Sequence, residues 1–426
     1  MKKIITRRGR EYCYSSYTNR ISLWNSESGF NFDAKSDVSF YASNDYRFDK
    51  VSLFVIEITQ QCNLRCRYCC YSGSYESRRV HNDCDISWKI LRNCVNFIEA
   101  HADLDEPYIT ICFYGGEALL ARQKITWLIS ELTKNTDIKF HFSISTNGVL
   151  LTDDVIDWIC SIPNLKLTVT LDGDKVLHDR NRVTKSGSGS YDVIMHNLRR
   201  FKEYHPKEYE ERLVFLSTIC SIFDLERLSN YWQSNPVIAN KRPVRISQVM
   251  ANFSKGEKIS LKETDLISVY DKALKMYLSG EENILTDELK RLANVIERRE
   301  FFKLPEAQKF ITCCHAPYSC FITAQGELYI CERFCQNLDV GNIETGFDQS
   351  KCNDLVERFT ERKNLYCSGC WAKRLCRICA TNLNYSDEEL KQMCQAERRS
   401  LELALRYYCE IQEYAHTVKL YNWETS

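Results

Sequence analysis

The segment Cys62-Asn63-Leu64-Arg65-Cys66-Arg67-Tyr68-Cys69 constrains this chain more than any other. It follows an apolar, β-branched run over residues 51–58, so the three cysteines are expected on a loop at the end of a strand. Three thiolates at this spacing can hold three irons of a four-iron, four-sulfur cluster and leave the fourth iron open for chemistry. The alternative, a buried helix face, is disfavoured by the preceding strand and by the poor helix start at Gln60, Gln61 and Asn63.

Length, charge and cysteine content limit the setting of this loop. The chain has 426 residues, enough for a large domain plus a smaller one. Its 57 basic and 57 acidic residues balance, which predicts no overall attraction to nucleic acid or to a membrane. No apolar run reaches the roughly 20 residues of a membrane span, and no apolar segment follows the basic residues 1–10 as in a secretory signal. We therefore expect a cytosolic protein whose 22 cysteines bind metal instead of forming disulfides.

Strand and helix patterns alternate over residues 50 to about 300, which predicts a parallel sheet with ligand sites at the C-terminal strand ends. Each polar segment found at those ends could by itself be an ordinary turn or cap. The paired glycines would let the backbone approach a ligand, and the Glu117 carboxylate could pair with an ammonium group. The segments are Gly115-Gly116-Glu117, Ser145-Thr146-Asn147, Leu171-Asp172-Gly173 and His178-Asp179-Arg180-Asn181-Arg182, and the strands are expected at 51–58, 107–113, 139–145, 166–171, 213–220 and 244–249.

A second group of cysteines lies towards the C-terminus, ten of them between Cys313 and Cys379. The two CxxC pairs, Cys367 with Cys370 and Cys376 with Cys379, would suit a structural zinc ribbon. Eight thiolates divide more naturally into two four-cysteine iron–sulfur clusters. The zinc alternative is disfavoured because it leaves four cysteines unexplained, namely Cys314, Cys320, Cys331 and Cys394.

The first motif, with an aromatic residue before its third cysteine, resembles the signature of the radical S-adenosylmethionine (SAM) enzymes. In that family the open iron chelates SAM, which is cleaved to methionine and a 5′-deoxyadenosyl radical that abstracts a substrate hydrogen. The resemblance implies an α/β fold, a partial (β/α)6 barrel open on one side. One departure is Ala118, where many members have proline. The cluster ligands implied are Cys62, Cys66 and Cys69, and the residues implied at the cofactor are Tyr68, Gly115, Gly116, Glu117, Ser145, Asn147, Asp172 and Arg182.

The later cysteines resemble the SPASM domain that is appended to many radical SAM peptide and protein maturases. The resemblance implies two auxiliary clusters, hence three [4Fe-4S] clusters in all together with SAM. Only two residues separate Cys376 from Cys379, where many members have three. One implied ligand set is Cys314, Cys320, Cys331 and Cys379, the other is Cys367, Cys370, Cys376 and Cys394, and the rival ligands are Cys313, Cys335, Cys352 and, at the first site, Cys70.

The expected domain order follows from these motifs and from the helical periodicity between them. We expect the chain to consist of an N-terminal extension over 1–50, a radical SAM partial barrel over 51–254, a helical connector over 255–310, a SPASM domain over 311–400 and a C-terminal helix or tail over 401–426.

Two reactions of the family compete. In anaerobic sulfatase maturases, which oxidise serine or cysteine to formylglycine, an acidic residue after the auxiliary cysteine takes up the proton, and here Glu332 follows Cys331. Glu332 is therefore the predicted catalytic residue, although an exposed ion pair with Arg333 is the simpler explanation of the pair. The context of residues 329–334 and 340–343 looks more like maturases that install thioether or carbon–carbon cross-links in ribosomally made precursor peptides, and we favour this reaction.

The expected partners are a precursor peptide and an external electron donor of the flavodoxin or ferredoxin type. Because the first 50 residues are too few for a complete leader-binding domain, a separate leader-binding protein is a further expected partner. A protein that only relays electrons or binds a partner would be expected to lose the first cysteines or the SAM loops, and neither is lost.

Overall fold

The computed structural model describes residues 1–24, 39–41, 50–74, 79–239, 241–249, 263–299, 307–309, 318–333, 337–379, 381 and 386–414. The chain divides into two compact units. The barrel unit comprises residues 45–265 and 315–352, and the terminal unit comprises residues 1–44, 266–314 and 353–426.

Six parallel strands form the centre of the barrel unit, and each pairs with the next in chain order. This is the predicted partial barrel of six strands, and each strand lies within a few residues of its expected range. The alternation of exposure along β7 and β9 shows that one face of the sheet is buried and the other lies towards the barrel interior. The strands are β5 (Leu53–Thr59), β6 (Ile109–Gly115), β7 (Phe140–Thr146), β8 (Leu165–Thr170), β9 (Leu213–Ile219) and β10 (Pro243–Gln248).

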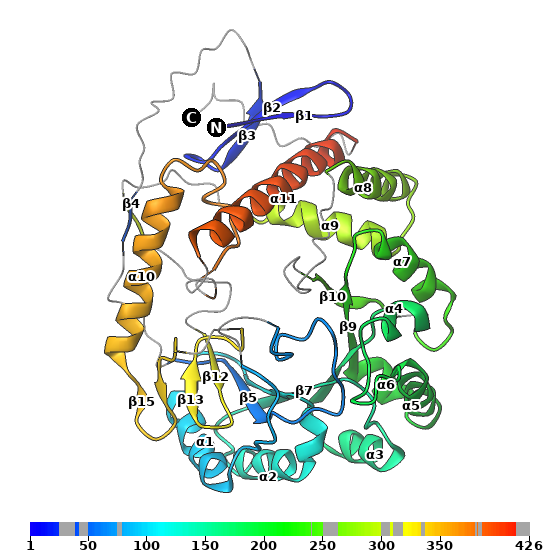
Figure 1. Ribbon diagram of the computed structural model, residues 1–426, viewed down its shortest axis with the longest axis vertical. Helices are drawn as coiled ribbons and strands as arrows, with labels where there is room; N and C mark the ends of the chain where they lie inside the picture. The colour runs from blue at the N-terminus through cyan, green and yellow to red at the C-terminus, as the bar shows by residue number, and fades with distance from the viewer. Residues whose placement is uncertain are drawn as a thin grey trace. The chain divides into compact units, whose positions relative to one another are not determined.

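Helices connect these strands and cover the outer side of the sheet, as Figure 1 shows for α1, α2, α3, α5 and α6. The apolar side chains between the two layers form the core. At its centre Ile144, Leu167 and Phe215 are each 0% exposed. The bounds are α1 (Trp88–His101), the 3-10 turn η1 (Ala118–Ala121), α2 (Arg122–Leu132), α3 (Asp153–Ser161), α4 (Lys175–Asp179), α5 (Tyr191–Tyr204), α6 (Pro206–Arg212) and α7 (Asp224–Ser234).

The sheet continues beyond β5 with residues from much later in the chain. Strand β12 (Ser319–Ile322) pairs with β5 in parallel, with Cys320 opposite Phe54. The antiparallel strands β13 (Glu327–Tyr329), β14 (Gly341–Asn342) and β15 (Gly346–Phe347) follow. Within the range 311–400, residues 315–352 belong to the barrel unit, to which the pairing of β12 with β5 joins them, whereas residues 353–400 belong to the terminal unit.

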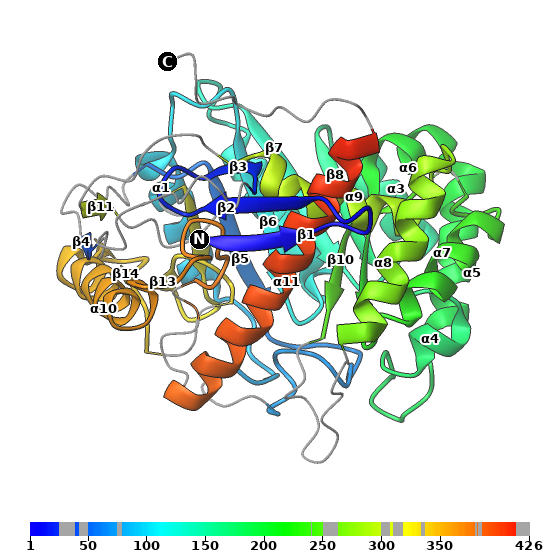
Figure 2. The ribbon, with the colours of Figure 1, turned by 90° about the horizontal axis from the view of Figure 1, so that it is seen from above.

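The terminal unit contains an N-terminal antiparallel sheet and long helices. The C-terminal helix α11 (Asp387–Tyr414) packs against α9 (Ile284–Glu297) and β1 (Lys2–Ile5) (Figures 1 and 2). A buried carboxylate fixes this packing, since Glu413 accepts hydrogen bonds from Thr6 Oγ1 (2.9 Å) and Tyr12 Oη (3.0 Å). The other elements are β2 (Glu11–Ser15), β3 (Arg20–Leu23), the pair β4 (Ser39–Tyr41) and β11 (Ala307–Lys309), α8 (Glu263–Leu278), and α10 (Gln349–Cys367), which begins at the last residues of the barrel unit.

Within the range 255–310, for which a helical connector is expected, the described residues include α8 and α9. The expected boundary at residue 400 falls inside α11, which is one continuous helix. Among the helices that the structure describes, none combines the length and the apolarity needed to cross a bilayer.

Candidate functional site

The loop that carries Cys62, Cys66 and Cys69 leaves the C-terminal end of β5 and is held by backbone hydrogen bonds. The amide of Arg65 donates to Val183 O (2.7 Å), and the amide of Arg67 donates to Asn181 O (2.9 Å). Leu64, between the first two cysteines, is 1% exposed and anchors the loop. Hydrogen-bonded on one edge and anchored by a buried leucine, the loop presents three partly buried thiols from one short segment.

Gly115 and Gly116 bring the end of β6 against the residues directly before Cys62. The Gly116 amide donates to Thr59 O (2.9 Å). A Cβ added at Gly115 would lie 2.0 Å from Thr59 O, and one at Gly116 would lie 2.1 Å from Gln61 O. The close approach that these glycines permit is therefore to the backbone that positions the cysteine loop.

Glu117 follows the two glycines and is 1% exposed. Its carboxylate accepts hydrogen bonds from Thr146 Oγ1 (2.7 Å), the Asn147 amide (2.7 Å) and the Leu119 amide (3.1 Å). Burial raises the pKa of this carboxyl, and the three donors oppose the rise. Glu117 therefore joins the ends of β6 and β7 and positions Asn147. The ammonium partner that the sequence suggests for this carboxylate stays a prediction.

Asn147 in turn reaches the cysteine loop. Its side-chain amide donates to Asn63 Oδ1 (2.6 Å) and lies 4.0 Å from Cys62 Sγ. Ser145 lies on the partly exposed face of β7, opposite to the buried Ile144. The ends of β6 and β7 therefore bring Gly115, Gly116 and Asn147 to the cysteine loop that follows β5.

A buried polar group contacts the loop from the other side. The Tyr68 hydroxyl donates to Asp172 Oδ2 and accepts from Arg182 Nη1 (2.9 Å). Asp172 Oδ1 also accepts from the Thr218 amide (2.7 Å), and burial raises the pKa of Asp172. Burial likewise raises the pKa of Tyr68 well above its usual value, so the phenol stays neutral.

Arg182 places a buried positive charge beside the thiols. Burial raises the pKa of the Cys66 thiol, and the Arg182 guanidinium acts against that rise. Arg182 Nε is buried and has no hydrogen-bond partner among the described residues. Three thiols on one loop, a buried cation and a spare donor fit an anionic iron–sulfur cluster bound at Cys62, Cys66 and Cys69.

His178 explains why the segment His178-Asp179-Arg180-Asn181-Arg182 stands next to this group. Its Nδ1 accepts from the Asp172 amide (3.3 Å), and its Nε2 lies 3.0 Å from Ser190 Oγ, which donates to Arg182 O (2.9 Å). The ring is 0% exposed, and burial lowers its pKa to about 2. A neutral imidazole therefore holds both Asp172 and Arg182 in place.

The barrel interior also contains an arginine that no sequence motif indicated. Arg79 Nη2 donates to Tyr71 Oη (2.9 Å) and to Glu332 O (2.8 Å), and its guanidinium lies 4.3 Å from the centre of the Phe321 ring. Its Nε lies 3.7 Å from the buried Glu57 carboxylate. Arg79 thus links the segment after Cys69 to the backbone of the predicted catalytic residue, Glu332.

The Glu332 side chain contacts Cys331 and lies close to residues of β6. Its Oε2 accepts from Cys331 Sγ (3.1 Å). Burial raises the pKa of Cys112 to about 12, and the charge of Glu332 contributes to that rise. The pKa of Tyr114 is also raised, by Tyr71 first and by Glu332 among weaker causes. Glu332 is therefore close to side chains of β6, the strand that ends in the two glycines.

The cysteines predicted for one auxiliary cluster are less fully described. Cys314 and the rivals Cys313 and Cys335 lie outside the described residues. Cys331 is partly exposed, whereas Cys320 on β12 is 0% exposed. Burial raises the pKa of Cys320, and the neighbouring Cys94 and Cys352 raise it further. The thiol of Cys320 therefore lies near Cys94 on α1 and Cys352 on α10. Among the described residues, neither Cys331 nor Cys379 contributes to that rise in its pKa.

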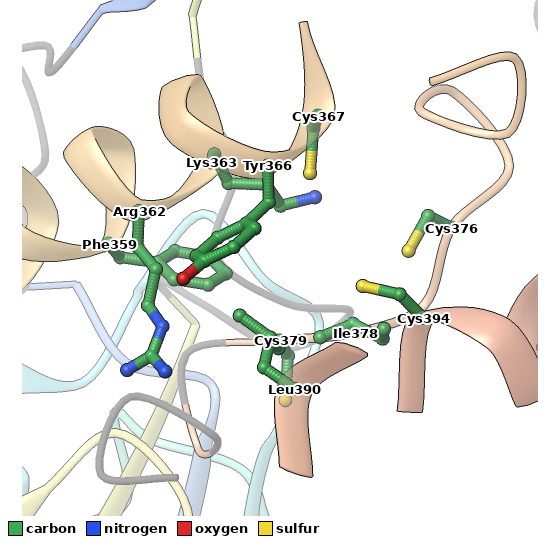
Figure 3. A pocket seen from close by; sticks show the side chains of 10 residues that line it. All are labelled: Phe359, Arg362, Lys363, Tyr366, Cys367, Cys376, Ile378, Cys379, Leu390 and Cys394. Atoms are coloured by element: carbon green, nitrogen blue, oxygen red, sulfur yellow. The ribbon is translucent and has the colours of Figure 1, made fainter. Parts of the chain in front are cut away.

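The other predicted set lies within the terminal unit. Figure 3 shows the sulfurs of Cys367, Cys376 and Cys394 directed into one space, a pocket that these cysteines line. Cys370 belongs with them, because its charge raises the pKa of both Cys367 and Cys394 after burial does so. Cys379 lines the same pocket, and its sulfur lies 3.0 Å from Thr381 Oγ1.

A buried lysine accompanies these thiols. Lys363 on α10 is 7% exposed and lines the same pocket. Burial raises the pKa of Cys376 to about 11, and the Lys363 charge opposes the rise there and at Cys367 and Cys394. A cation beside four thiols favours their deprotonated, metal-binding forms.

Comparison with known proteins finds a family match for the part of the chain that contains the Cys62, Cys66 and Cys69 loop. Residues 56–217 match the family model described as the radical SAM superfamily. They form a radical SAM domain. This range includes the cysteine loop, the paired glycines, Asn147 and Arg182.

Similar proteins share this radical SAM domain. A cysteine-type anaerobic sulfatase-maturating enzyme of Clostridium novyi is 29% identical over 161 residues, which are 36% of this chain and 41% of that enzyme. The radical SAM cyclopropyl synthase TigE of Paramaledivibacter caminithermalis is 24% identical over 162 residues, 36% of this chain and 34% of the synthase. The match thus spans 41% of the length of the first of these curated relatives and 34% of the second.

Two solved structures share the fold over a longer range. The structure of anSMEcpe with bound AdoMet and the Cp18Cys peptide covers 85% of this chain and 99% of its own, with a TM-score of 0.63 and 18% identity. SuiB of Streptococcus suis bound to the precursor peptide SuiA covers 81% of this chain and 75% of its own, with a TM-score of 0.52 and 13% identity. These likenesses confirm the predicted α/β radical SAM fold.

Replacing Gly116 by alanine should loosen the cysteine loop. The added Cβ meets the Gln61 carbonyl, so the β6 loop must shift, at a cost of about 1–3 kcal/mol. We expect a lower unfolding midpoint in urea and a loss of iron from the reconstituted protein. Gly369→Ala is the control for the unfolding midpoint alone, because nothing lies within 4 Å of a Cβ at that glycine but it stands between the proposed ligands Cys367 and Cys370. An unchanged midpoint and iron content in Gly116→Ala would show that the contact does not constrain the loop.

His178 should make the barrel unit sensitive to acid. The pKa of the imidazole is about 6.5 in an unfolded chain. Burial in the folded chain lowers this pKa to about 2. Below about pH 6.5 the unfolded state therefore binds the extra proton, and stability is lost as the pH falls, by up to about 1.4 kcal/mol per unit. We expect His178→Asn to flatten the dependence of urea stability on pH between about 6 and 4. The exposed His196→Gln should leave it unchanged, and equal slopes in all three proteins would contradict the assignment.

Cys394→Ser should lower the iron content of the reconstituted protein by about four irons per chain, the content of one four-iron cluster. The reason is that the Cys394 sulfur shares the pocket with Cys367 and Cys376. Cys409→Ser on the same helix is the matched control, since that thiol is 3% exposed and does not line the pocket. The measurement is iron and sulfide per chain after anaerobic reconstitution. The same iron content in both variants would mean that Cys394 is no ligand.

Proposed function

We propose that this protein is a radical SAM peptide maturase that oxidises a ribosomally made precursor peptide and installs a thioether or carbon–carbon cross-link. The observation that carries the proposal is the convergence of the Cys62, Cys66 and Cys69 loop with the ends of β6, β7 and β8. Arg182 supplies a buried guanidinium whose charge opposes the rise in the pKa of Cys62 and Cys66 that burial causes. The radical SAM domain and the peptide-bound neighbours of the same fold support it.

In this proposal Cys62, Cys66 and Cys69 hold a [4Fe-4S] cluster whose open iron takes SAM. When bound, the pair supplies a 5′-deoxyadenosyl radical that abstracts a substrate hydrogen. The protein's part is to fix the loop and the cofactor. The paired glycines set the loop backbone, and Asn147 and Arg182 offer donors beside it. The residues proposed at SAM are Tyr68, Gly115, Gly116, Glu117, Ser145, Asn147, Asp172 and Arg182.

Two auxiliary [4Fe-4S] clusters complete the proposal, one with Cys367, Cys370, Cys376 and Cys394, the other with Cys314, Cys320, Cys331 and Cys379. The first set has three sulfurs directed into one space, with Lys363 beside them. The role of these residues is to provide a site that accepts the electron a substrate radical must lose.

Glu332 is the proposed proton acceptor. Closing a cross-link from a substrate radical releases one electron and one proton, and a carboxylate near the reacting carbon can take the proton. The Arg79 guanidinium holds the Glu332 carbonyl, and the carboxylate lies near Tyr114 and Cys112 of β6. Glu332 therefore belongs to the same strand ends as the proposed radical source.

Formylglycine formation on a sulfatase serine or cysteine is the second candidate. It is favoured by the match to cysteine-type sulfatase-maturating enzymes and by a carboxylate directly after Cys331. Both reactions remove two electrons from a peptide side chain, so the radical centre alone does not separate them. A precursor peptide and an external flavodoxin- or ferredoxin-type donor are the partners in the first case, with a separate leader-binding protein for peptide recognition.

The test incubates the reconstituted protein anaerobically with SAM, a reductant and peptides encoded beside its gene. We expect 5′-deoxyadenosine release and a peptide lighter by two hydrogens whose fragmentation places a cross-link between two residues. A sulfatase-derived peptide carrying serine or cysteine is tested in parallel, with a hydrazide reagent to trap an aldehyde. A trapped aldehyde without a cross-link would establish the second candidate, and failure to cleave SAM would overturn both.

Glu332→Gln separates the proton acceptor from the radical source. We expect it to release 5′-deoxyadenosine as the wild type does while forming product about 100-fold more slowly. Glu327→Gln, an exposed carboxylate on β13, should form product at the wild-type rate. If Glu332→Gln retained full product formation, the carboxylate would have no part in the reaction.

A further inference from the structure

Three side chains of different metal-binding types meet on the outer helices of the barrel unit, apart from the site described above. Cys160 lies on α3, His205 lies between α5 and α6, and Glu208 lies on α6. One ligand atom from each lies within 4.8 Å of the other two, and all three residues are partly buried. Within the described part of the chain this is the sole group of its kind. The loop cysteines, the SAM-side residues and Glu332 all lie elsewhere.

The backbone around these side chains is fixed. The His205 amide donates to Phe201 O (2.9 Å), and the His205 carbonyl accepts from the Tyr209 amide (2.9 Å). Tyr209 is 0% exposed and packs edge-on against Phe201, so the turn that carries His205 rests on the core. The position of the imidazole is thus set by α5 and α6 together.

Arg212, at the end of α6, joins that turn to the helix that carries Cys160. Its Nη1 donates to Ile162 O (2.9 Å) and to Cys160 O (3.3 Å), which occupy the C-terminal end of α3. This arginine satisfies carbonyls that the helix leaves unpaired. The segments that carry the three side chains are therefore held to one another independently of any ion, which lowers the cost of binding one.

The imidazole also has the carboxylate partner that metal-bound histidines commonly use. His205 Nε2 lies 2.7 Å from Asp157 Oδ1. With Nε2 donating to that carboxylate, the ring keeps its lone pair on Nδ1, the nitrogen then available to a metal. A carboxylate on the second nitrogen fixes the tautomer and the ring orientation in metal sites.

The ligand set indicates which metal fits. One sulfur, one imidazole nitrogen and one carboxylate oxygen are all ligands of zinc, at about 2.0–2.3 Å from the ion. A tetrahedral ion at those bond lengths sets its ligand atoms about 3.5 Å apart, so rotations of partly exposed side chains would close the present spacing. A calcium or magnesium ion would prefer oxygen ligands alone.

We propose that Cys160, His205 and Glu208 bind a zinc ion, with Asp157 orienting the imidazole and water completing the tetrahedron. The proposal does not depend on the proposed function, because no residue of the radical SAM centre takes part. A zinc ion here would connect α3 to the α5–α6 turn and so stiffen the outer layer of the barrel.

The test measures zinc retained by reconstituted, iron-loaded protein after incubation with ZnCl2 and passage over a chelating resin. We expect the wild type to keep one more zinc per chain than Cys160→Ser, His205→Gln and Glu208→Gln, each of which should bind zinc at least about tenfold more weakly. The controls are His196→Gln on α5 and Glu211→Gln on α6, both exposed, and both should behave as the wild type. Asp157→Asn should weaken binding by about tenfold, since it touches only the imidazole.

X-ray absorption at the zinc edge distinguishes this site from zinc in empty cluster sites. The expected shell has one sulfur and the rest nitrogen or oxygen, whereas zinc bound by cluster cysteines would show sulfur only. Circular dichroism and iron content check that each variant folds, and the two surface variants, His205→Gln and Glu208→Gln, decide the result if Cys160→Ser does not. Equal zinc in all proteins, or an all-sulfur shell, would overturn the proposal.

Discussion

The proposed radical centre depends on the backbone contacts that hold the cysteine loop. Three thiols within eight residues cannot fix their own geometry, because a loop of that length has many conformations. Here the amides of Arg65 and Arg67 bond to the segment before α5, and the amide of Gly116 bonds to the carbonyl of Thr59, three residues before Cys62. A side chain at Gly116 would clash with the Gln61 carbonyl, so this glycine lets the end of β6 approach the backbone that leads into the loop.

The buried charges near the loop follow from that arrangement. An isolated guanidinium would be costly to bury, and Arg182 is 5% exposed. Its charge is offset by Asp172, with the Tyr68 hydroxyl bonded to both, while neutral His178 holds the two backbones. Since that balance leaves Arg182 Nε without a partner among the described residues, an anionic cluster beside it would complete the set. The arrangement of Tyr68, Asp172 and Arg182 therefore suits an anion beside the loop. The three thiols by themselves do not indicate this charge preference.

The sequence predicted the local elements well and the long-range pairings poorly. The six strands, the loops at their ends and the order of the motifs all follow from alternating apolar patterns. The pairing of β12 with β5 does not, because a four-residue strand has no pattern that selects a partner far away in the chain. Arg79 was missed for the same reason, since its contacts with Tyr71 and Glu332 join segments that carry no shared motif. The hydrogen bonds of Glu117 with Thr146 and Asn147 were likewise not predicted, because these partners come from the end of another strand.

The terminal cysteines show that spacing along the chain and grouping in space are separate constraints. Two CxxC pairs suggest four ligands of one ion, and Cys367, Cys376 and Cys379 of these pairs do line one pocket. A further cysteine of that pocket, Cys394, comes from α11. Cys370 follows α10, and its charge raises the pKa of both Cys367 and Cys394 after burial does so. Because the fold brings a fifth cysteine from a separate helix to the two pairs, the spacing of the pairs does not define which four thiols share one ion.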